Sequence, residues 1–213
     1  MLLYKLMFLI VLTILTSCKP QATTALNNGD LLFFKPQGSD MDQAISRSTG
    51  KEFVHVAIIE VDKDKRIWVI DATPQNGVSR VPVKEKLAKE KKEDIYVYRL
   101  RDTSGIDASV RKAKSLVGKG YDWYFSQEND KYYCSELVWE CYTRPSEKHI
   151  FDQTPMNFMD KDGHLPIFWK ELFENLHTPV PQGQPGTNPQ DLSHSTELTD
   201  TGIRLDVKKD RRP

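Results

Sequence analysis

Cys134 lies where a polar loop meets an amphipathic helix, a position in which a thiol is readily activated. The preceding loop, 126–130, is wholly polar, whereas apolar residues recur at helical spacing from Leu137 to Tyr142. A helix that begins within a residue or two of Cys134 would expose the thiol to free backbone N–H groups and to the positive end of the helix dipole. Both effects favour the thiolate, which attacks carbonyl carbon. The alternative is that Cys134 is a small buried hydrophobic residue, as many single cysteines are.

His55 is the histidine best placed to act as the base for this thiol. A cysteine nucleophile needs a partner that keeps it ionised and carries its proton, and the pKa of histidine suits both tasks. Four of the five histidines lie in loop, turn, helix-end or tail sequence, whereas His55 stands inside an apolar, β-branched run. Buried polar groups are usually paired, so His55 is either satisfied structurally or used in chemistry.

Asp71 is predicted to orient His55 across a β-hairpin. The runs 53–60 and 67–71 are apolar and β-branched and flank a charged turn, so they are interpreted as two antiparallel strands. If the hairpin turns about Lys63, His55 faces Asp71, and facing residues have Cβ atoms ~5 Å apart. Asp71 could then accept a hydrogen bond from one ring nitrogen and leave the other for the thiol.

Three alternatives to this assignment are considered. Glu60 has the opposite parity to His55 along its strand, so it should point to the other face of the sheet and is rejected as the third member. A register shift of one residue would place Ala72, not Asp71, opposite the histidine. A cysteine, a histidine and a carboxylate could also hold zinc, but the two-residue and three-residue ligand spacings of zinc motifs are absent. No metal and no cofactor are therefore expected.

Short strands and helices alternate around these residues, which predicts an α+β fold. Apolar or β-branched runs bounded by turn residues predict strands at 31–34, 53–60, 67–71, 78–81 and 95–100. Helical spacing and cap residues predict helices at 39–50, 83–92 and 106–117, besides the one that begins near Cys134. The charges of 83–92 are interpreted as a solvated face. The aromatic segment 165–176 is assigned to the core or to a lid.

Residues 1–18 have the pattern of a secretion signal. Lys5 precedes an apolar run that is too short to span a bilayer, and small residues follow the run. Residues 15–18 resemble a bacterial lipoprotein cleavage box, in which the cysteine, here Cys18, is lipidated and becomes the mature N-terminus. Residues 19–28 are then expected to be a tether, and the protein a membrane-anchored lipoprotein of the bacterial cell envelope, on its periplasmic or surface side. An ordinary cleaved signal is the alternative.

Length and charge constrain the part of the chain beyond the leader. Fewer than two hundred residues remain, so 29–177 is expected to form one domain, and the polar segment 178–213 a disordered tail. The 30 lysines and arginines balance the 30 acidic residues, which argues against a nucleic-acid binder and against a membrane held by charge alone. Cys134 and Cys141 are seven residues apart on one helix, a rise of ~10 Å, which is too far for a disulfide.

Five short motifs resemble a known family in their order and spacing. They are Gly29-Asp30 before an apolar strand, 55–58 on a strand, 70–72 at the end of the next strand, 120–122, and 133–137 around the cysteine. Together they resemble the YiiX-like branch of the NlpC/P60 superfamily, which are circularly permuted papain-like proteins related to lecithin retinol acyltransferase. In that family the histidine precedes the cysteine along the chain, as it does here.

The resemblance implies a permuted papain-like fold, with an antiparallel sheet and the nucleophile helix packed against it. It also implies a cysteine hydrolase or acyltransferase that acts on an amide or ester bond of a lipid or peptide through Cys134, His55 and Asp71. The third residue of relatives is frequently a glutamate, so Asp71 is a departure accepted on chemical equivalence. Tyr121 matches a family tyrosine, and Tyr121 and Tyr133 are expected to bind substrate unless Tyr121 only packs.

Two other functions remain open at this point. One is a peptidoglycan endopeptidase of the unpermuted NlpC/P60 kind, against which the order of histidine and cysteine argues. The other is a non-catalytic envelope module that keeps the fold and binds a lipid or peptide. Neither the substrate nor the choice between hydrolysis and acyl transfer follows from the residues alone.

Overall fold

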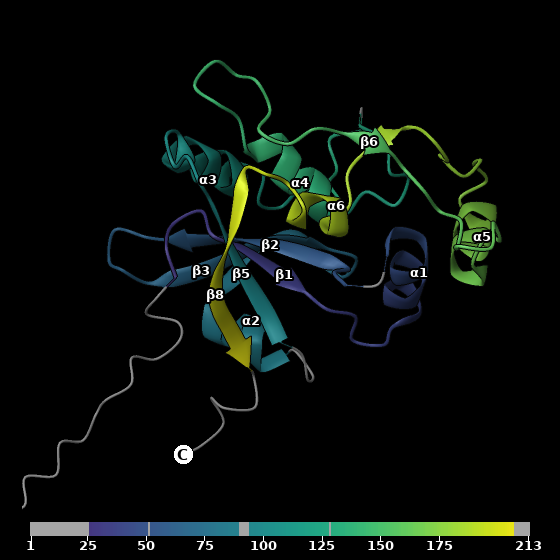
Figure 1. Ribbon diagram of the computed structural model, residues 1–213, viewed down its shortest axis with the longest axis horizontal. Coiled ribbons are helices and arrows are strands. Elements are labelled where there is room, and N and C mark those ends of the chain that lie inside the picture. The colour runs from purple at the N-terminus through teal and green to yellow at the C-terminus, as the bar shows by residue number, and fades with distance from the viewer. Residues whose placement is uncertain (1–25, 51, 90–93, 128, 207–213) are drawn as a thin grey trace, which may run out of the picture.

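A six-stranded sheet organises the computed structural model, which describes residues 26–50, 52–89, 94–127 and 129–206. Its strands are β1 Leu31–Phe34, β2 His55–Val61, β3 Ile67–Thr73, β4 Gly77–Pro82, β5 Asp94–Leu100 and β8 Leu198–Asp206. They lie in the order β4-β3-β2-β1-β5-β8 with antiparallel neighbours (Figure 1). A second, two-stranded sheet pairs β6 Thr154–Pro155 with β7 Pro185–Gly186. The expected α+β class and antiparallel sheet are confirmed.

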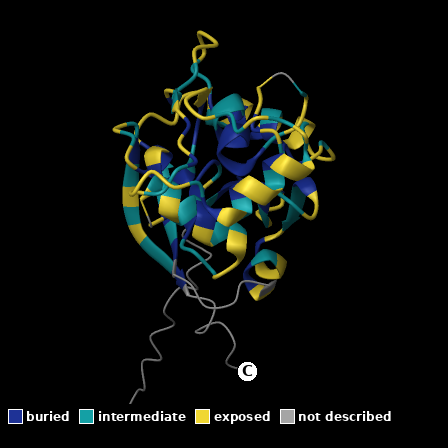
Figure 2. Ribbon diagram, turned by 90° about the vertical axis from the view of Figure 1, so that its right-hand side faces the viewer, coloured by how far each residue is buried: buried dark blue, intermediate teal, exposed yellow. Residues whose placement is uncertain are grey.

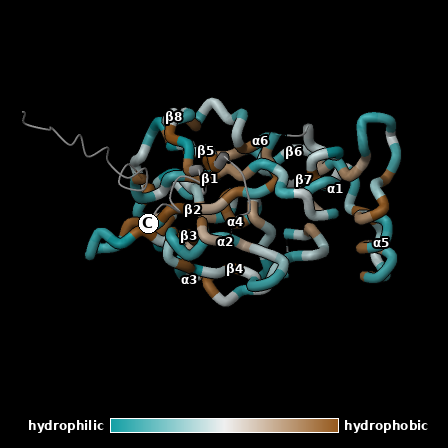
Figure 3. The backbone as a smooth tube through the Cα atoms, turned by 90° about the horizontal axis from the view of Figure 1, so that it is seen from below, coloured by the Kyte–Doolittle hydropathy of each residue, from teal (hydrophilic) through white to brown (hydrophobic). Residues whose placement is uncertain are grey.

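Helices cover both faces of the large sheet. They are α1 Asp40–Thr49, α2 Val83–Lys89, α3 Ile106–Ser115, α4 Cys134–Cys141, α5 Ile167–Asn175 and α6 Pro189–Ser193. Helices α3, α4 and α6 lie on one face and α2 on the other (Figure 1). Helices α1 and α5 stand next to each other at one end of the molecule, as the view from below shows (Figure 3). No described helix is long and apolar enough to cross a membrane.

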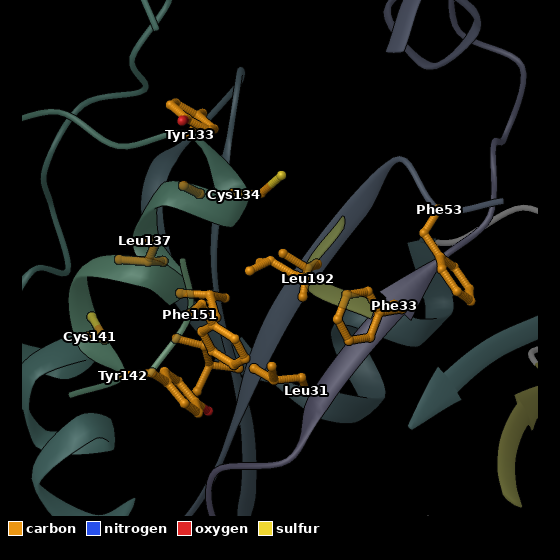
Figure 4. Close-up of a cluster of buried hydrophobic side chains, with 14 of the residues drawn as sticks. Leu31, Phe33, Phe53, Tyr133, Cys134, Leu137, Cys141, Tyr142, Phe151 and Leu192 are labelled. Atoms are coloured by element: carbon orange, nitrogen blue, oxygen red, sulfur yellow. The ribbon is translucent and has the colours of Figure 1, made fainter. Parts of the chain in front are cut away.

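Alternate residues of the strands fill two separate hydrophobic layers. Leu31 and Phe33 of β1 point into the layer that contains α4, where Leu137 packs (Figure 4). Their neighbours Leu32 and Phe34 point into the smaller layer beneath α2. Side chains alternate between the two faces of a strand, so a strand buried on both faces is apolar throughout. Buried residues accordingly run through the middle of the molecule, and exposed ones occupy loops and outer helix faces (Figure 2).

Helix α4 begins at Cys134, within the limits that the sequence predicted. Tyr133 precedes it in an extended conformation, and the Glu136 side chain accepts a hydrogen bond from the Tyr133 N–H at 3.2 Å. The loop before the helix is held by Asp122, a fully buried residue whose carboxylate accepts hydrogen bonds from the N–H groups of two following residues, 124 and 126. Cys141 is the last residue of the helix. Cys134 and Cys141 are both free thiols.

The C-terminal segment is folded, so the prediction of a disordered tail over 178–213 is wrong as far as the structure describes it. Strand β8 pairs with β5 along its length, and Leu198 and Leu205 are buried. The two leucines are an odd number of positions apart and lie in different hydrophobic layers, and the pairing shifts register between Tyr96 and Tyr98 of β5. The residues of β8 at and before this irregularity, 199–202, are all polar or glycine, so no apolar alternation marks the strand in the sequence. Residues 207–213 lie outside the described part.

The predicted N-terminal boundary also needs correction. The predicted signal 1–18, with Cys18, lies outside the described residues, as does most of the predicted tether 19–28. The last three tether residues belong to the folded domain instead. Leu26 is buried in the smaller hydrophobic layer, and Oδ1 of Asn28 accepts a hydrogen bond from the Val61 N–H at 3.0 Å. The domain therefore includes residues from Leu26 onward.

Candidate active site

The β2–β3 hairpin brings His55 and Asp71 together in a register that differs from the predicted one. Ile58 pairs with Ile70, so the hairpin turns about Asp64, one residue later than predicted. This moves the pairing by two residues and preserves parity, so the two side chains remain on the same face as diagonal neighbours. Diagonal neighbours are still within reach of long side chains. Nε2 of His55 lies 3.1 Å from Oδ2 of Asp71, which brings together the two residues that the sequence analysis linked.

Asp71 is a buried carboxylate that three side chains hold in place. Besides His55, Lys86 of α2 places Nζ 2.8 Å from Oδ2, and the Ser79 hydroxyl donates to Oδ1 at 3.2 Å. Burial alone would raise the pKa of Asp71, but the hydrogen bond from His55 and the charge of Lys86 hold it well below the usual range of a carboxyl group. Asp71 is therefore ionised over the whole pH range in which the protein would work.

Lys86 is the site residue that the sequence analysis missed, because the charges of α2 were interpreted as a solvated face. Its side chain is only 13% exposed, and its Nζ lies 5.2 Å from the centre of the Phe34 ring. The available signal was its neighbour Leu87, which is buried and turns that side of α2 toward the sheet. A lysine beside such a residue can extend along the apolar face and place its charge beside a buried acid.

His55 reaches Cys134 around the end of the sheet. As the first residue of β2, His55 sits at the strand end beside Phe34, and the two rings lie 5.1 Å apart. Cys134 approaches from the opposite face, since α4 packs in the layer on the other side. The Cys134 side chain lies near enough to His55 to raise the pKa of the ring, and both residues line the same cleft. Because Nε2 faces the Asp71 carboxylate, Nδ1 is the ring nitrogen that remains for the thiol.

The ionisation of His55 depends on these two partners. Burial by itself would lower the pKa of His55, but the hydrogen bonds to Asp71 and Cys134 raise it to about 9. The charge of Lys86 acts in the opposite direction and lowers the pKa of the ring. At neutral pH the imidazole is therefore protonated, and a cation stands beside the Cys134 sulfur.

The cysteine and histidine line an open cleft of about 740 Å³. One wall comes from the segment after β1 and from α1, including Gln37 and Met41, and another comes from the loop after β3. Aromatic side chains form the third side, namely Tyr121, Trp123 and Phe168 of α5. Tyr121 thus lies where the sequence analysis expected it, and the segment 165–176 contributes to both core and cleft. Any role of Tyr121 in substrate binding stays a prediction.

Tyr133 does not line the open cleft but a smaller pocket beside it. Its hydroxyl accepts a hydrogen bond from the Thr187 N–H at 3.1 Å and lies 4.0 Å from Sδ of Met156. Tyr133 therefore touches the site through the smaller pocket.

Glu60, which parity excluded as the third member, faces away from His55 and forms an ion pair with Lys114 of α3 at 2.7 Å.

Comparison with known proteins agrees with this geometry. Residues 25–201 match the family described as permuted papain-like amidase enzyme, YaeF/YiiX, C92 family. The chain belongs to this family. It is similar to the uncharacterized protein YiiX of Escherichia coli strain K12, with 25% identity over 194 residues, which cover 90% of this chain and 93% of the relative. The predicted YiiX-like resemblance and permuted papain-like fold are confirmed.

A solved structure of an amidase-family relative supports the fold. The crystal structure of YiiX from Escherichia coli O157:H7 superimposes with a TM-score of 0.69 at 23% sequence identity, covering 84% of this chain and 96% of that one. That protein is described as a metalloprotein. In the described part of this chain, no group of three or more histidine, cysteine, aspartate or glutamate side chains could hold a metal ion. Oδ2 of Asp71, moreover, already bonds His55 and Lys86. The residues of this site therefore do not fit a metal.

Proposed function

We propose that this member of the permuted papain-like amidase family is a cysteine hydrolase that cleaves an amide or ester bond of a lipid or peptide. Cys134 is the nucleophile, His55 the acid and base, and Asp71 the residue that orients and stabilises the imidazolium. The observation that carries the proposal is the chain of contacts from Cys134 through His55 to the buried Asp71 at the wall of the open cleft. Membership of an amidase family supports the reaction type.

The first half of the reaction forms an acyl-enzyme. The Cys134 thiolate attacks the carbonyl carbon, and a carbon–sulfur bond forms as the carbonyl oxygen takes up the negative charge. The N–H of Cys134, in the first turn of α4, is one donor for that oxygen, because the first N–H groups of a helix have no partner within it. The tetrahedral intermediate then collapses, the bond to the leaving group breaks, and His55 gives its Nδ1 proton to the leaving amine or alcohol.

The second half releases the acyl group. The now neutral His55 takes a proton from water, the hydroxide attacks the thioester, and the carboxylic acid leaves as the thiolate reforms. An amine in place of water would make the same protein an acyltransferase. A protonated imidazole at neutral pH suits this cycle, because the cation favours the thiolate at the start and supplies the proton for the leaving group.

The leader pattern supports a location in the cell envelope. Residues 1–18 carry the signal pattern and Cys18 the lipidation box, so the domain would be anchored to a membrane by lipid. A peptidoglycan endopeptidase would find its substrate in the same compartment. No feature of the cleft favours that activity over the general one, so the proposal is kept at the level of the bond cleaved.

The test uses 4-nitrophenyl pentanoate, an activated ester that reports hydrolysis by its released phenolate. Cys134→Ser and His55→Ala should each lower the rate at least ~100-fold, because nucleophile and base act as a unit. Asp71→Asn should retain intermediate activity. Cys141→Ala, which removes the other described thiol, serves as the matched control and should keep the wild-type rate. If Cys134→Ser hydrolyses the ester as fast as the Cys141→Ala control, Cys134 is not the nucleophile.

A further inference from the structure

A second pocket of about 60 Å³ adjoins the open cleft at the thiol. Ile45, Val54, Tyr121 and Cys134 line both spaces, so the small pocket begins beside the sulfur. Its other walls include Phe125, Phe158 and Trp169, whose rings pack edge to face 5.1–5.5 Å apart. The rigid packing of these rings gives the pocket a defined size.

Four buried polar atoms around this pocket have no hydrogen-bond partner in the protein. They are the hydroxyl oxygens of Ser48, Ser135 and Thr187 and the indole Nε1 of Trp169. In the described part of the chain only five side-chain atoms are in this state, and four of them belong to residues that line this one pocket. Buried polar groups are normally paired, and each unpaired one costs free energy. The four atoms are themselves shielded from solvent, so a ligand in this cavity would supply the missing partners once the side chains turn toward it.

The residues that line the pocket indicate the chemistry of that ligand. Apart from the Cys134 thiolate, none of the described residues that line the pocket carries a charge at neutral pH, so the group that enters is uncharged. The Trp169 Nε1–H can only donate, whereas the three hydroxyls can donate or accept, so a hydrogen-bond acceptor satisfies any of the four. At ~15 Å³ for each water-sized group, 60 Å³ holds about four non-hydrogen atoms.

The position of His55 indicates which part of a substrate enters the small pocket. His55 lines the open cleft but not the small pocket, and it is the residue that protonates the leaving group. The leaving group therefore departs into the cleft, and the acyl group bonded to Cys134 has the small pocket on its other side. We propose that this space, the acyl pocket, selects a short, uncharged acyl group that carries a hydrogen-bond acceptor. The inference rests on the proposed function, and it excludes long-chain fatty acyl groups as the natural acyl part.

Three 4-nitrophenyl esters test the proposal. The 3-methoxypropanoate and the pentanoate differ only in an ether oxygen in place of a methylene, and both extend four non-hydrogen atoms beyond the carbonyl. The wild-type protein should acylate Cys134 about fivefold to tenfold faster with the 3-methoxypropanoate, after correction for the intrinsic reactivity of each ester, as one neutral hydrogen bond allows. The octanoate should react more slowly than the pentanoate. Acylation is followed by nitrophenolate release and by the intact mass of the protein.

Variants separate recognition from general reactivity. In the double variant Ser48→Ala/Thr187→Val the ratio of the 3-methoxypropanoate rate to the pentanoate rate should shrink toward unity, because the ether oxygen loses two of its possible partners. Thr196→Val, which alters an exposed threonine outside the pocket, should keep the wild-type preference.

The contradicting outcomes are distinct. Equal corrected rates for the two isosteric esters in wild type and double variant would mean that the pocket holds only water, and an octanoate as fast as the pentanoate would refute the size limit. Failure of all three esters to acylate Cys134 would instead overturn the proposed function, and the inference with it.

Discussion

Lys86 places its Nζ 2.8 Å from Oδ2 of Asp71, the same oxygen that faces Nε2 of His55 at 3.1 Å. One buried carboxylate oxygen thus serves two cations that come from different elements, a strand and a helix. Lys86 stabilises the ionised form of Asp71 and, through its charge, lowers the pKa of His55. The lysine is therefore a positioning residue that sets the proton affinity of the histidine without touching the thiol.

Replacement of this lysine should move the alkaline limb of the activity profile. In Lys86→Met the apolar stem remains but the charge is lost, so the pKa of His55 should rise above about 9. The imidazolium would then persist to higher pH, and hydrolysis of 4-nitrophenyl pentanoate should decline at correspondingly higher pH. Lys84→Met, at an exposed position on the same helix, is the control and should leave the limb in place. If activity of Lys86→Met declines at the same pH as in the wild type, or at a lower pH, the role of Lys86 is refuted.

Local patterns predicted the strands and the start of α4 well, because each depends on neighbours in the sequence. The site itself depends on register and on distant contacts. His55 and Asp71 remain neighbours despite the error in the predicted hairpin turn only because a shift of two residues preserves the face on which a side chain lies. Lys86 was missed because its partner comes from another element, 15 positions earlier in the chain. Strand β8 was missed because residues 199–202, in its first half, are all polar or glycine.

The residues of the acyl pocket are even harder to predict from local sequence. Ser48, Ser135, Trp169 and Thr187 are far apart in the sequence and belong to α1, α4, α5 and the loop before α6. Nothing in their local sequence marks them as neighbours, and an unpaired hydroxyl is recognised only once every other contact is known. Short-range patterns can therefore propose a nucleophile and its base but cannot identify the residues that line this pocket.

Glu136 should make the stability of the protein depend on pH. Its burial, and then the charge of Asp122, raise its pKa from 4.5 to about 8. Between these values the unfolded chain has lost the proton that the folded protein retains, so stability falls as pH rises from 4.5 through 8. Glu136→Gln cannot ionise and keeps the side-chain oxygen that accepts from the Tyr133 N–H. It should exceed the wild type by about 1–3 kcal/mol at pH 9 and match it near pH 4.

Urea unfolding at the two pH values measures this difference. Glu140→Gln is the control, because Glu140 is half-exposed and pairs with Lys112 at 2.6 Å, so its replacement should give no gain at pH 9. The pH dependence that arises from His55 and Asp71 is common to all three proteins and cancels in the comparison. A Glu136→Gln protein that is no more stable than the wild type at pH 9 would show that Glu136 is ionised in the fold.

Strand β8 should contribute to the stability of the sheet. Leu205 is only 2% exposed, so Leu205→Ala should lower the free energy of unfolding by about 2–4 kcal/mol, the usual cost of a cavity in a core. Ile203→Ala, at a partly exposed position on the same strand, should cost clearly less. Urea denaturation of both variants gives the comparison. Equal and negligible losses would mean that β8 does not dock on β5 in solution.

Cys18 should determine where the protein is found. In Cys18→Ala the lipidation site is absent, so the protein should leave the membrane fraction while the folded domain, which begins by Leu26, keeps its thermal stability. Cell fractionation with a high-salt wash detects the change, and Cys141→Ala, which leaves the lipidation box intact, should remain with the membranes. Retention of Cys18→Ala on washed membranes would place the anchor elsewhere.

The rate at which iodoacetamide alkylates Cys134 at different pH values tests the central claim most directly, because it requires no substrate. A free thiol with a pKa of ~8.5 is only ~1% thiolate at pH 6.5. Cys141 will not interfere, since burial raises the pKa of its thiol to about 12, and mass spectrometry of the peptide that contains Cys134 follows the right residue.

If His55 is an imidazolium held beside the sulfur by Asp71, wild-type Cys134 should react at pH 6.5 nearly as fast as at pH 8. His55→Ala should slow alkylation at pH 6.5 at least tenfold, and Asp71→Asn by an intermediate factor. A wild-type rate that follows the titration of a free thiol and is unchanged in His55→Ala would contradict the account.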